Sequence, residues 1–304
     1  MCHLVNFLIR KCIFAVIMSK FRETITVLIV SILTIIEVTG CYEPSDIDAF
    51  DSGEPAIVIE GLITDFDSTC SVIVSQSVAP TDSANCIFIN NATVIIRDDL
   101  GNTAQLQNIG DGKYQTKDII GKPEHEYLLT IEIDENSYNS IERMPKSINI
   151  DSIIVEYQST RTFFDTIGYY ISIFAPKTED SVLYYRVEIE RNNTLLDGYS
   201  NLWIYEDNHK TDIFQMDIPQ NFETGDSLTI KIYSLTKPIY EYYFGLSKQF
   251  NINFSNIQPP LTNPESNINP TALGYFQAST VNSFHLIVGN EMRKVVKIKD
   301  TPPQ

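Results

Sequence analysis

The sequence predicts an all-β protein made of two β-sandwich domains, with one short helix near the C-terminus. From residue 56 onward, short runs of β-branched residues are separated by turn residues, which is typical of sheet proteins. Several runs alternate apolar and polar residues, so each has one face suited to a core. A single late stretch changes to the 3.6-residue period of a helix.

Residues 56–145 are expected to form the N-terminal sandwich. The predicted strands are Ile57–Thr64, Ser71–Val78, Ala92–Arg97, Thr103–Gln107, Lys113–Thr116, Tyr127–Ile133 and Asn136–Glu142. Glycine, asparagine and aspartate occupy the intervening turns, as in Asp98–Asn102 and Gly110–Gly112. About seven strands in roughly 90 residues favour a sandwich.

Residues 146–304 are expected to form a second sandwich of the fibronectin type III kind. The predicted strands are Ile153–Gln158, Gly168–Phe174, Leu183–Glu190, Asn201–Tyr205, Ile213–Met216, Ser227–Ser234, Leu273–Ala278, Ser283–Val288 and Arg293–Ile298. A helix is predicted over 238–250, because Pro238 suits a first helical turn and apolar residues then recur on one face. Asn251–Pro270 is too polar for regular structure.

The first 40 residues have the pattern of a lipoprotein signal peptide. Met18–Arg22 is basic, Ile25–Ile36 is apolar, and Val38-Thr39-Gly40 precedes Cys41, the expected lipidation site. The apolar run is shorter than the roughly 20 residues that a membrane span needs. Translation starts at Met18, or else the chain has a long signal with two apolar runs. Residues 41–55 are acidic and read as a flexible tether.

Charge and cysteine content limit the partners of the mature chain. Residues 1–40 hold four of the 22 basic and two of the 39 acidic residues, which leaves 18 against 37 and a formal charge of −19. Such a chain repels phosphate backbones, so nucleic-acid binding is not expected. Cys70 and Cys86 are either a disulfide or two separate thiols, and the spacing leaves both alternatives open.

Several short stretches carry a resemblance to a known family. They are Cys41–Pro44, Ile57–Thr64, Asn91–Asp98, Gly112–Thr116, Ile150–Ile153, Tyr240–Phe250 and Leu273–Phe276. In their order and spacing, the whole mature chain resembles the Bacteroidota lipoproteins called domain of unknown function 4249. The resemblance implies an outer-membrane lipoprotein that is often encoded beside a TonB-dependent receptor. It also implies a first domain similar to prealbumin or carboxypeptidase-regulatory modules, and it carries over no catalytic residue.

The residues that could carry chemistry are few. His125, His209 and His285 are isolated in the sequence, and no metal-ligand spacing, nucleophile elbow or phosphate-binding loop occurs. We therefore expect no catalytic residues, no metal and no cofactor. Aromatic residues on sandwich loops can anchor partners, and Phe163, Phe164 and Trp203 are the candidates, although alternation buries half of any strand.

Six Asp-Ser or Asp-Thr pairs are followed by threonine, alanine, isoleucine, valine or leucine. This pattern resembles the O-glycosylation sequon that Bacteroidota use on exported proteins, and it is also ordinary turn chemistry before a strand. The candidate modified residues are Ser68, Ser83, Ser152, Thr166, Ser181 and Ser227.

These observations favour a non-enzymatic, lipid-anchored protein on the outer membrane, exposed at the cell surface. Its expected role is that of an accessory to a TonB-dependent transporter in nutrient capture, with a ligand that the sequence does not name. The alternatives are a structural or adhesion protein without a small ligand, and a hydrolase whose carboxylates lie among the 37 acidic residues.

Overall fold

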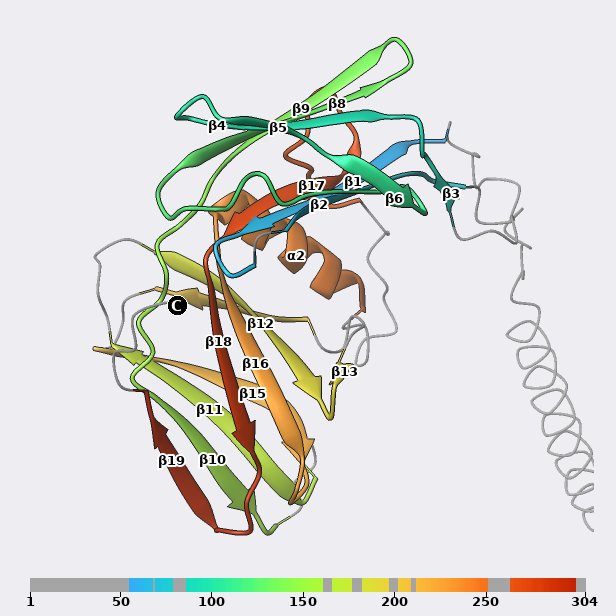
Figure 1. Ribbon diagram of the computed structural model, residues 1–304. Helices are drawn as coiled ribbons and strands as arrows, with labels where there is room; N and C mark the ends of the chain where they lie inside the picture. Colours follow the sequence, from blue (N-terminus) through green and yellow to red (C-terminus); the bar gives the residue numbers. More distant parts are fainter. Residues whose placement is uncertain are drawn as a thin grey trace, which may run out of the picture. The chain divides into compact units, whose positions relative to one another are not determined.

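The computed structural model describes residues 55–67, 69–78, 86–160, 166–176, 182–196, 202–208, 212–250 and 263–298. Within these ranges the chain forms nineteen strands and one helix, α2 (Lys237–Phe250). The fold is all-β, as the sequence predicts, and its strands form two sandwiches (Figure 1). The signal segment, Cys41 and the tether up to residue 54 lie outside the described residues.

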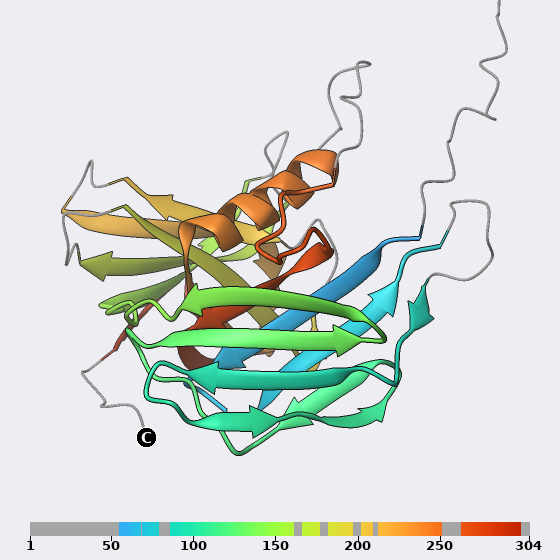
Figure 2. The same cartoon turned by 90° about the horizontal axis from the view of Figure 1, so that it is seen from above.

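The first sandwich has a six-stranded sheet facing a four-stranded sheet. The six-stranded sheet contains β1 (Ile57–Thr64), β2 (Cys70–Gln76), β3 (Ile87–Phe88), β6 (Gln107–Gly110), β7 (Lys113–Thr116) and β17 (Leu273–Ser279). The four-stranded sheet contains β4 (Thr93–Asp98), β5 (Thr103–Gln105), β8 (Glu126–Ile133) and β9 (Asn136–Arg143). Seen from above, the green strands β8 and β9 cross the blue strands β1 and β2 (Figure 2).

The alternating residues of these strands supply the first core. Ile59 and Ile63 of β1 and Leu129 and Ile131 of β8 are fully buried or nearly so, and most of the residues next to them in sequence are partly or fully exposed. Gly61 lies between them, and a Cβ atom there would be 2.9 Å from the Phe276 ring. The core therefore depends on period-two patterning and on one close approach.

The placement of β17 differs from the sequence-based domain boundaries. The prediction assigned all residues after 145 to the second sandwich, but β17 pairs in parallel with β1, from Val58 opposite Leu273 to Thr64 opposite Ser279. Phe276 and Ala278 are buried in the first core. The C-terminal part of the chain therefore completes the first sandwich before returning to the second.

The second sandwich has a four-stranded and a five-stranded sheet. The four-stranded sheet contains β10 (Ser152–Gln158), β11 (Gly168–Pro176), β15 (Ile213–Phe222) and β19 (Arg293–Lys297). The five-stranded sheet contains β12 (Leu183–Arg191), β13 (Thr194–Leu195), β14 (Trp203–Asp207), β16 (Ser227–Leu235) and β18 (Val281–Ile287). β17 ends at Ser279 and β18 begins at Val281, so only Thr280 separates the two strands. A nearly continuous extended segment therefore passes from one sandwich to the other.

The helix α2 packs on the outer face of the five-stranded sheet and against β17. Ile239 and Tyr243 are buried there with Tyr233 and Leu235 of β16. The backbone carbonyl of Thr236 accepts the Tyr240 N–H at 3.0 Å, so Thr236 is the N-cap of the predicted helix. No helix among the described residues is long and apolar enough to span a membrane.

The two cysteines of the first sandwich are separate thiols. Cys70 is buried at one end of β2, whereas Cys86 precedes β3, whose Ile87 pairs with Gln76 at the other end. The two ends of this seven-residue strand are about 20 Å apart, and a disulfide requires Cα atoms within about 7 Å. The disulfide alternative is thus wrong for this fold. Burial raises the pKa of the Cys70 thiol to about 12.

Candidate functional site

A cleft of about 400 Å³ lies where the linker between the sandwiches, residues 144–149, passes beside β12. The first sandwich contributes Glu124 and Arg143 to its lining, and the second contributes Leu183 and Tyr185. The linker contributes the remaining residues, namely Met144, Pro145, Lys146, Ser147, Ile148 and Asn149. The volume lies within the range of small-molecule pockets. We call this feature the junction cleft.

Backbone hydrogen bonds fix the wall of the junction cleft formed by the first sandwich. The Glu124 N–H donates to the Met144 carbonyl at 2.8 Å, and the Met144 N–H donates to the His125 carbonyl at 2.9 Å. The linker hydroxyl of Ser147 donates to the Asn282 side-chain oxygen in β18 at 2.6 Å. The linker is therefore held to both sandwiches at its two ends.

The mouth of the junction cleft carries exposed ion pairs. Lys146 Nζ lies 3.7 Å from Glu124 Oε1, and Arg143 Nη1 lies 3.9 Å from Glu126 Oε1. All four side chains are more than half exposed. Pairs of this length and exposure contribute about 0–1 kcal/mol, so they do not lock the mouth in one arrangement.

The floor of the junction cleft is apolar. Met144 is fully buried, and Ile148 and Tyr185 are 8% and 4% exposed. Tyr185 lies opposite Ser234 of β16 in the sheet register, and the Ser234 N–H donates to the Thr280 carbonyl at 3.0 Å. The buried hydroxyls of Ser234 and Thr280 have no hydrogen-bond partner within the described structure. Since buried polar atoms are normally paired, the two unpaired hydroxyls indicate that the packing behind Tyr185 is not optimised for stability alone.

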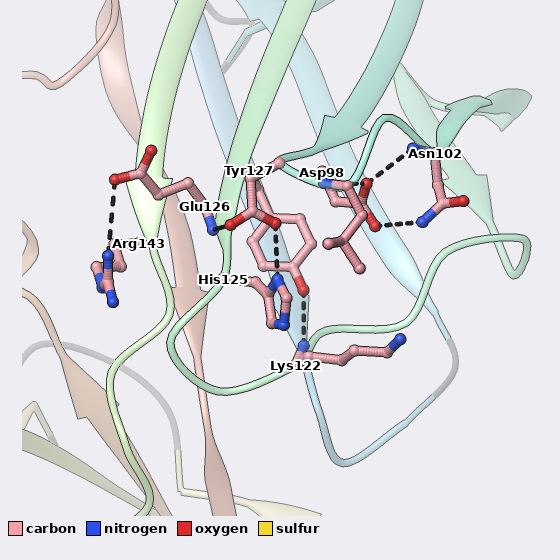
Figure 3. A network of polar contacts seen from close by, with 9 residues as sticks. Asp98, Asn102, Lys122, His125, Glu126, Tyr127 and Arg143 are labelled. Atoms are coloured by element: carbon pink, nitrogen blue, oxygen red, sulfur yellow. Dashed lines mark hydrogen bonds and ion pairs between the residues drawn. The ribbon is translucent and has the colours of Figure 1, made fainter.

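A polar network borders the junction cleft at the same end of the first sandwich (Figure 3). Asp98 closes the β4–β5 turn, where its carboxylate accepts the Leu100 and Asn102 N–H groups at 3.1 and 2.8 Å. The Asn102 side chain donates to the same carboxylate at 2.7 Å. Because one aspartate satisfies three donors within a single turn, this part of the network is structural.

The second part of the network joins this turn to the segment before β8. His125 Nδ1 lies 2.7 Å from Asp99 Oδ1, and this hydrogen bond holds the pKa of Asp99 below its ordinary value. The buried Tyr127 hydroxyl accepts the Lys122 N–H at 2.7 Å, and burial raises the pKa of Tyr127 (Figure 3). These contacts shape the loop that presents Glu124 to the junction cleft.

The opposite side of the junction, around α2, is closed by buried aromatic and polar side chains. We call it the helix side. The Arg186 guanidinium lies 4.5 Å from the centre of the Tyr233 ring and 5.1 Å from that of Tyr243. It also pairs with Glu188 at 3.5 Å, and the two side chains are 17% and 19% exposed. The Tyr243 hydroxyl donates to buried Gln277 of β17 at 2.8 Å, which links the helix to the first sandwich.

A buried carboxylate adds a further link on the helix side. Glu142 of β9 is 5% exposed, and it accepts the Thr236 hydroxyl and the Asn267 side-chain N–H, both at 2.8 Å. Burial raises the pKa of Glu142, and the two hydrogen bonds oppose the rise. The carboxylate thus joins the first sandwich to the N-terminus of α2.

Of the three aromatic residues predicted to bind a partner, the structure describes Trp203 alone. Trp203 is 5% exposed and belongs to the second core, so its prediction as a surface anchor is wrong. The reason is its register: Trp203 pairs with Val187, which faces the same core. Phe163 and Phe164 lie outside the described residues.

The candidate modified residues differ in accessibility. Ser152 is 5% exposed and donates to Asp151, and Ser227 is half-buried with its N–H bonded to Asn192. Thr166 is exposed. The other three candidates, Ser68, Ser83 and Ser181, lie outside the described residues.

The sequence reasoning missed the residues of the junction cleft. Their one visible signal is the pair Arg143 and Lys146 on either side of Pro145, at a predicted domain boundary. The cleft groups are cations, an acid, an amide and apolar side chains, which suit binding. Within the described ranges, no three His, Cys, Asp or Glu side chains are grouped as metal ligands would be.

Comparison with known proteins shows the family and finds structural neighbours of low sequence identity. The FN1–FN3 domains of chicken CNTN1 match at 12% identity and a TM-score of 0.21, covering 59% of this chain and 60% of that one. The adhesin InvE of Yersinia pseudotuberculosis matches at 10% identity and a TM-score of 0.17, covering 59% and 55%. The chain therefore spans less than two thirds of either structure, and among the curated proteins none matches it. The family model described as Domain of unknown function (DUF4249) matches residues 42–285, and the chain belongs to that family.

Proposed function

We propose that this protein is a lipid-anchored, surface-exposed accessory protein of the bacterial outer membrane. It binds a small ligand in the junction cleft and holds it beside a TonB-dependent transporter for nutrient capture. The proposal of an anchor rests on Val38-Thr39-Gly40-Cys41, with lipid on Cys41 and residues 42–55 as the tether. Tethering of this kind raises the local concentration of the bound ligand at the transporter.

The observation that carries the proposal is the distance between the chain's entry point and the junction cleft. The chain enters the fold at Ile57, the first residue of β1, and β1 ends at Thr64. The Thr64 carbonyl accepts the Gly121 N–H at 3.1 Å, just before Glu124, and β9 ends at Arg143. An eight-residue strand is about 25 Å long, so the cleft lies at the far end of the first sandwich from the entry point. This separation supports a ligand site distinct from the point where the chain enters the fold.

Membrane fractionation of a Cys41→Ala variant tests the anchor. We expect the parent chain with Cys41 in the outer-membrane fraction and the variant in the soluble fraction. Without the lipid, the acidic mature chain has no basic segment that would hold it on an anionic lipid surface. A variant that stays in the membrane fraction would overturn the lipid anchor.

Affinity purification of the lipidated protein in mild detergent tests the accessory role. We expect a TonB-dependent transporter to co-purify with the protein. Recovery of the lipidated protein without any transporter would reject this role while leaving the anchor intact.

A further inference from the structure

The charges at the mouth of the junction cleft favour an anionic ligand group. The lining contains two basic residues, Arg143 and Lys146, and one acidic residue, Glu124, in a chain whose mature part has 37 acidic and 18 basic residues. Both cations pair with carboxylates at the mouth, Arg143 with Glu126 and Lys146 with Glu124, so a ligand carboxylate would compete with these long, exposed pairs. A guanidinium and an ammonium three residues apart match a carboxylate, which arginine can bind through two parallel hydrogen bonds.

The ion pair between Arg143 and Glu126 can be exchanged at little cost. Arg143 lies 3.9 Å from Glu126, which is beyond hydrogen-bonding distance, and both side chains are exposed. A ligand carboxylate at about 2.8 Å would make a charge-assisted hydrogen bond in its place. The exchange loses a long surface pair of small energy and gains a short one.

The floor of the junction cleft favours an apolar ligand body. Met144 is fully buried, so the apolar surface that the floor offers comes from the nearly buried Ile148 and the half-buried Leu183. Burying the apolar surface of a ligand on them contributes about 25 cal/mol per Å². The unpaired hydroxyls behind Tyr185 mark this floor as a place where stability has not been maximised, as is usual at binding sites.

From this geometry we propose that the junction cleft binds a small amphipathic carboxylate. The carboxylate lies between Arg143 and Lys146, and the apolar body lies over Ile148 and Leu183. The inference rests on the proposed binding function and specifies its ligand class. It is independent of the lipid anchor and of any transporter.

Titration calorimetry with octanoate tests the ligand class on the mature chain, residues 41–304, carrying Cys41→Ala for solubility. Octan-1-ol and octylamine supply the same apolar body with a neutral and a cationic head. We expect octanoate to bind at least tenfold more tightly than either, because a charge-assisted hydrogen bond contributes more than a neutral one. Absence of octanoate binding, or equal or tighter binding of octan-1-ol or octylamine, would overturn the proposal.

A matched pair of double variants separates recognition from general charge effects. Arg143→Gln with Lys146→Gln is expected to weaken octanoate binding at least tenfold. Arg97→Gln with Arg293→Gln removes the same charge at exposed positions on β4 and β19 and is expected to leave binding unchanged. Equal effects of the two double variants would show that only net charge matters and would reject the site.

Two controls keep the result interpretable. The thermal unfolding midpoint of each double variant is measured first, and we expect little change because all four residues are exposed. The octanoate assay uses a chain without lipid, so its failure would reject the ligand class and leave the fractionation result for Cys41 standing. Conversely, octanoate binding by a protein that fails fractionation would keep the cleft and reject the anchor.

Discussion

The two sides of the junction between the sandwiches are built in opposite ways. On the helix side, Arg186 lies between tyrosine rings and pairs with Glu188, and both side chains are mostly buried. On the cleft side, Arg143 and Lys146 make long pairs with carboxylates, and all of these side chains are exposed. The same residue types thus form short, mostly buried contacts on the helix side and long, exposed pairs on the cleft side.

The difference follows from the elements that meet on each side. The helix side contains α2, β17 and the outer face of the five-stranded sheet, which supply aromatic side chains in contact. The cleft side contains an irregular stretch, residues 144–151, whose first six residues line the cleft together with Leu183 and Tyr185 of β12. We infer that the helix side holds the sandwiches together and that the cleft side is left available for a ligand.

The largest expected effect comes from Gly274, which places β17 against β1 on the helix side. Its φ is +95°, and a Cβ atom there would collide with the Ile59 backbone. Gly274→Ala should therefore lower the free energy of unfolding by about 4 kcal/mol, from backbone strain and overpacking together. Urea denaturation measures the change.

Gly101→Ala is the matched control for this prediction. Its φ is +91°, but a Cβ atom there would have no heavy atom within 4 Å. We expect a loss of about 1 kcal/mol from strain alone. Similar losses for the two variants would mean that the β1–β17 contact does not contribute to stability.

Arginine substitutions on the two sides compare them directly. Arg186→Met keeps an unbranched side chain but removes the main ionic partner of Glu188, which retains a 3.9 Å contact to Lys231 and a 3.3 Å hydrogen bond from the Tyr233 hydroxyl, so we expect a loss of about 3 kcal/mol. Arg143→Met on the cleft side should change stability by less than about 0.5 kcal/mol. Both are measured by urea denaturation, and a larger loss for Arg143→Met would contradict the division between the two sides.

The smallest expected effect concerns the pH dependence of the helix side. The pKa of Glu142 is raised by burial, so the folded state binds its proton more tightly than the unfolded state does. Stability from this group is therefore present below the unfolded-state pKa and is lost as pH rises through the raised folded-state pKa.

Glu142→Gln removes this dependence and keeps a side chain of the same shape. Thermal midpoints measured from pH 4 to pH 8 should decline less with rising pH in the variant than in the parent chain. Glu126→Gln, at an exposed position on β8, is the control and should leave the slope unchanged. An identical slope in all three proteins would mean that Glu142 is not desolvated.

Much of the fold could be predicted because its signals are local. The run Ile57–Thr64 was predicted with the bounds that β1 has, and the predicted helix over 238–250 differs from α2 by one residue. The place of β17 could not be predicted, since an apolar run such as Leu273–Ala278 suits either sheet. Its partner Val58 is more than 200 residues away, and no local pattern identifies a parallel partner at that distance.

The candidate site was less predictable for the same reason. Alternation shows that one face of a strand is buried, but the register decides which face, and this is why Trp203 was assigned to the wrong side. Arg143 and Lys146 stand at a predicted boundary, so their location was visible. The two residues line a cleft because Leu183 and Tyr185 of β12 lie close to them, and this proximity comes from tertiary packing.

The run from β17 into β18 has a consequence for the order in which the molecule can be completed. Asp65, just after β1, accepts the Val281 N–H at 2.8 Å across a separation of 216 residues. During synthesis the first sandwich therefore remains incomplete until almost the whole chain has been made. Until then the edge of β1 is uncovered and open to pairing with other chains. A fragment cut at residue 145 would keep that uncovered edge permanently, so the two halves cannot be produced as independent modules.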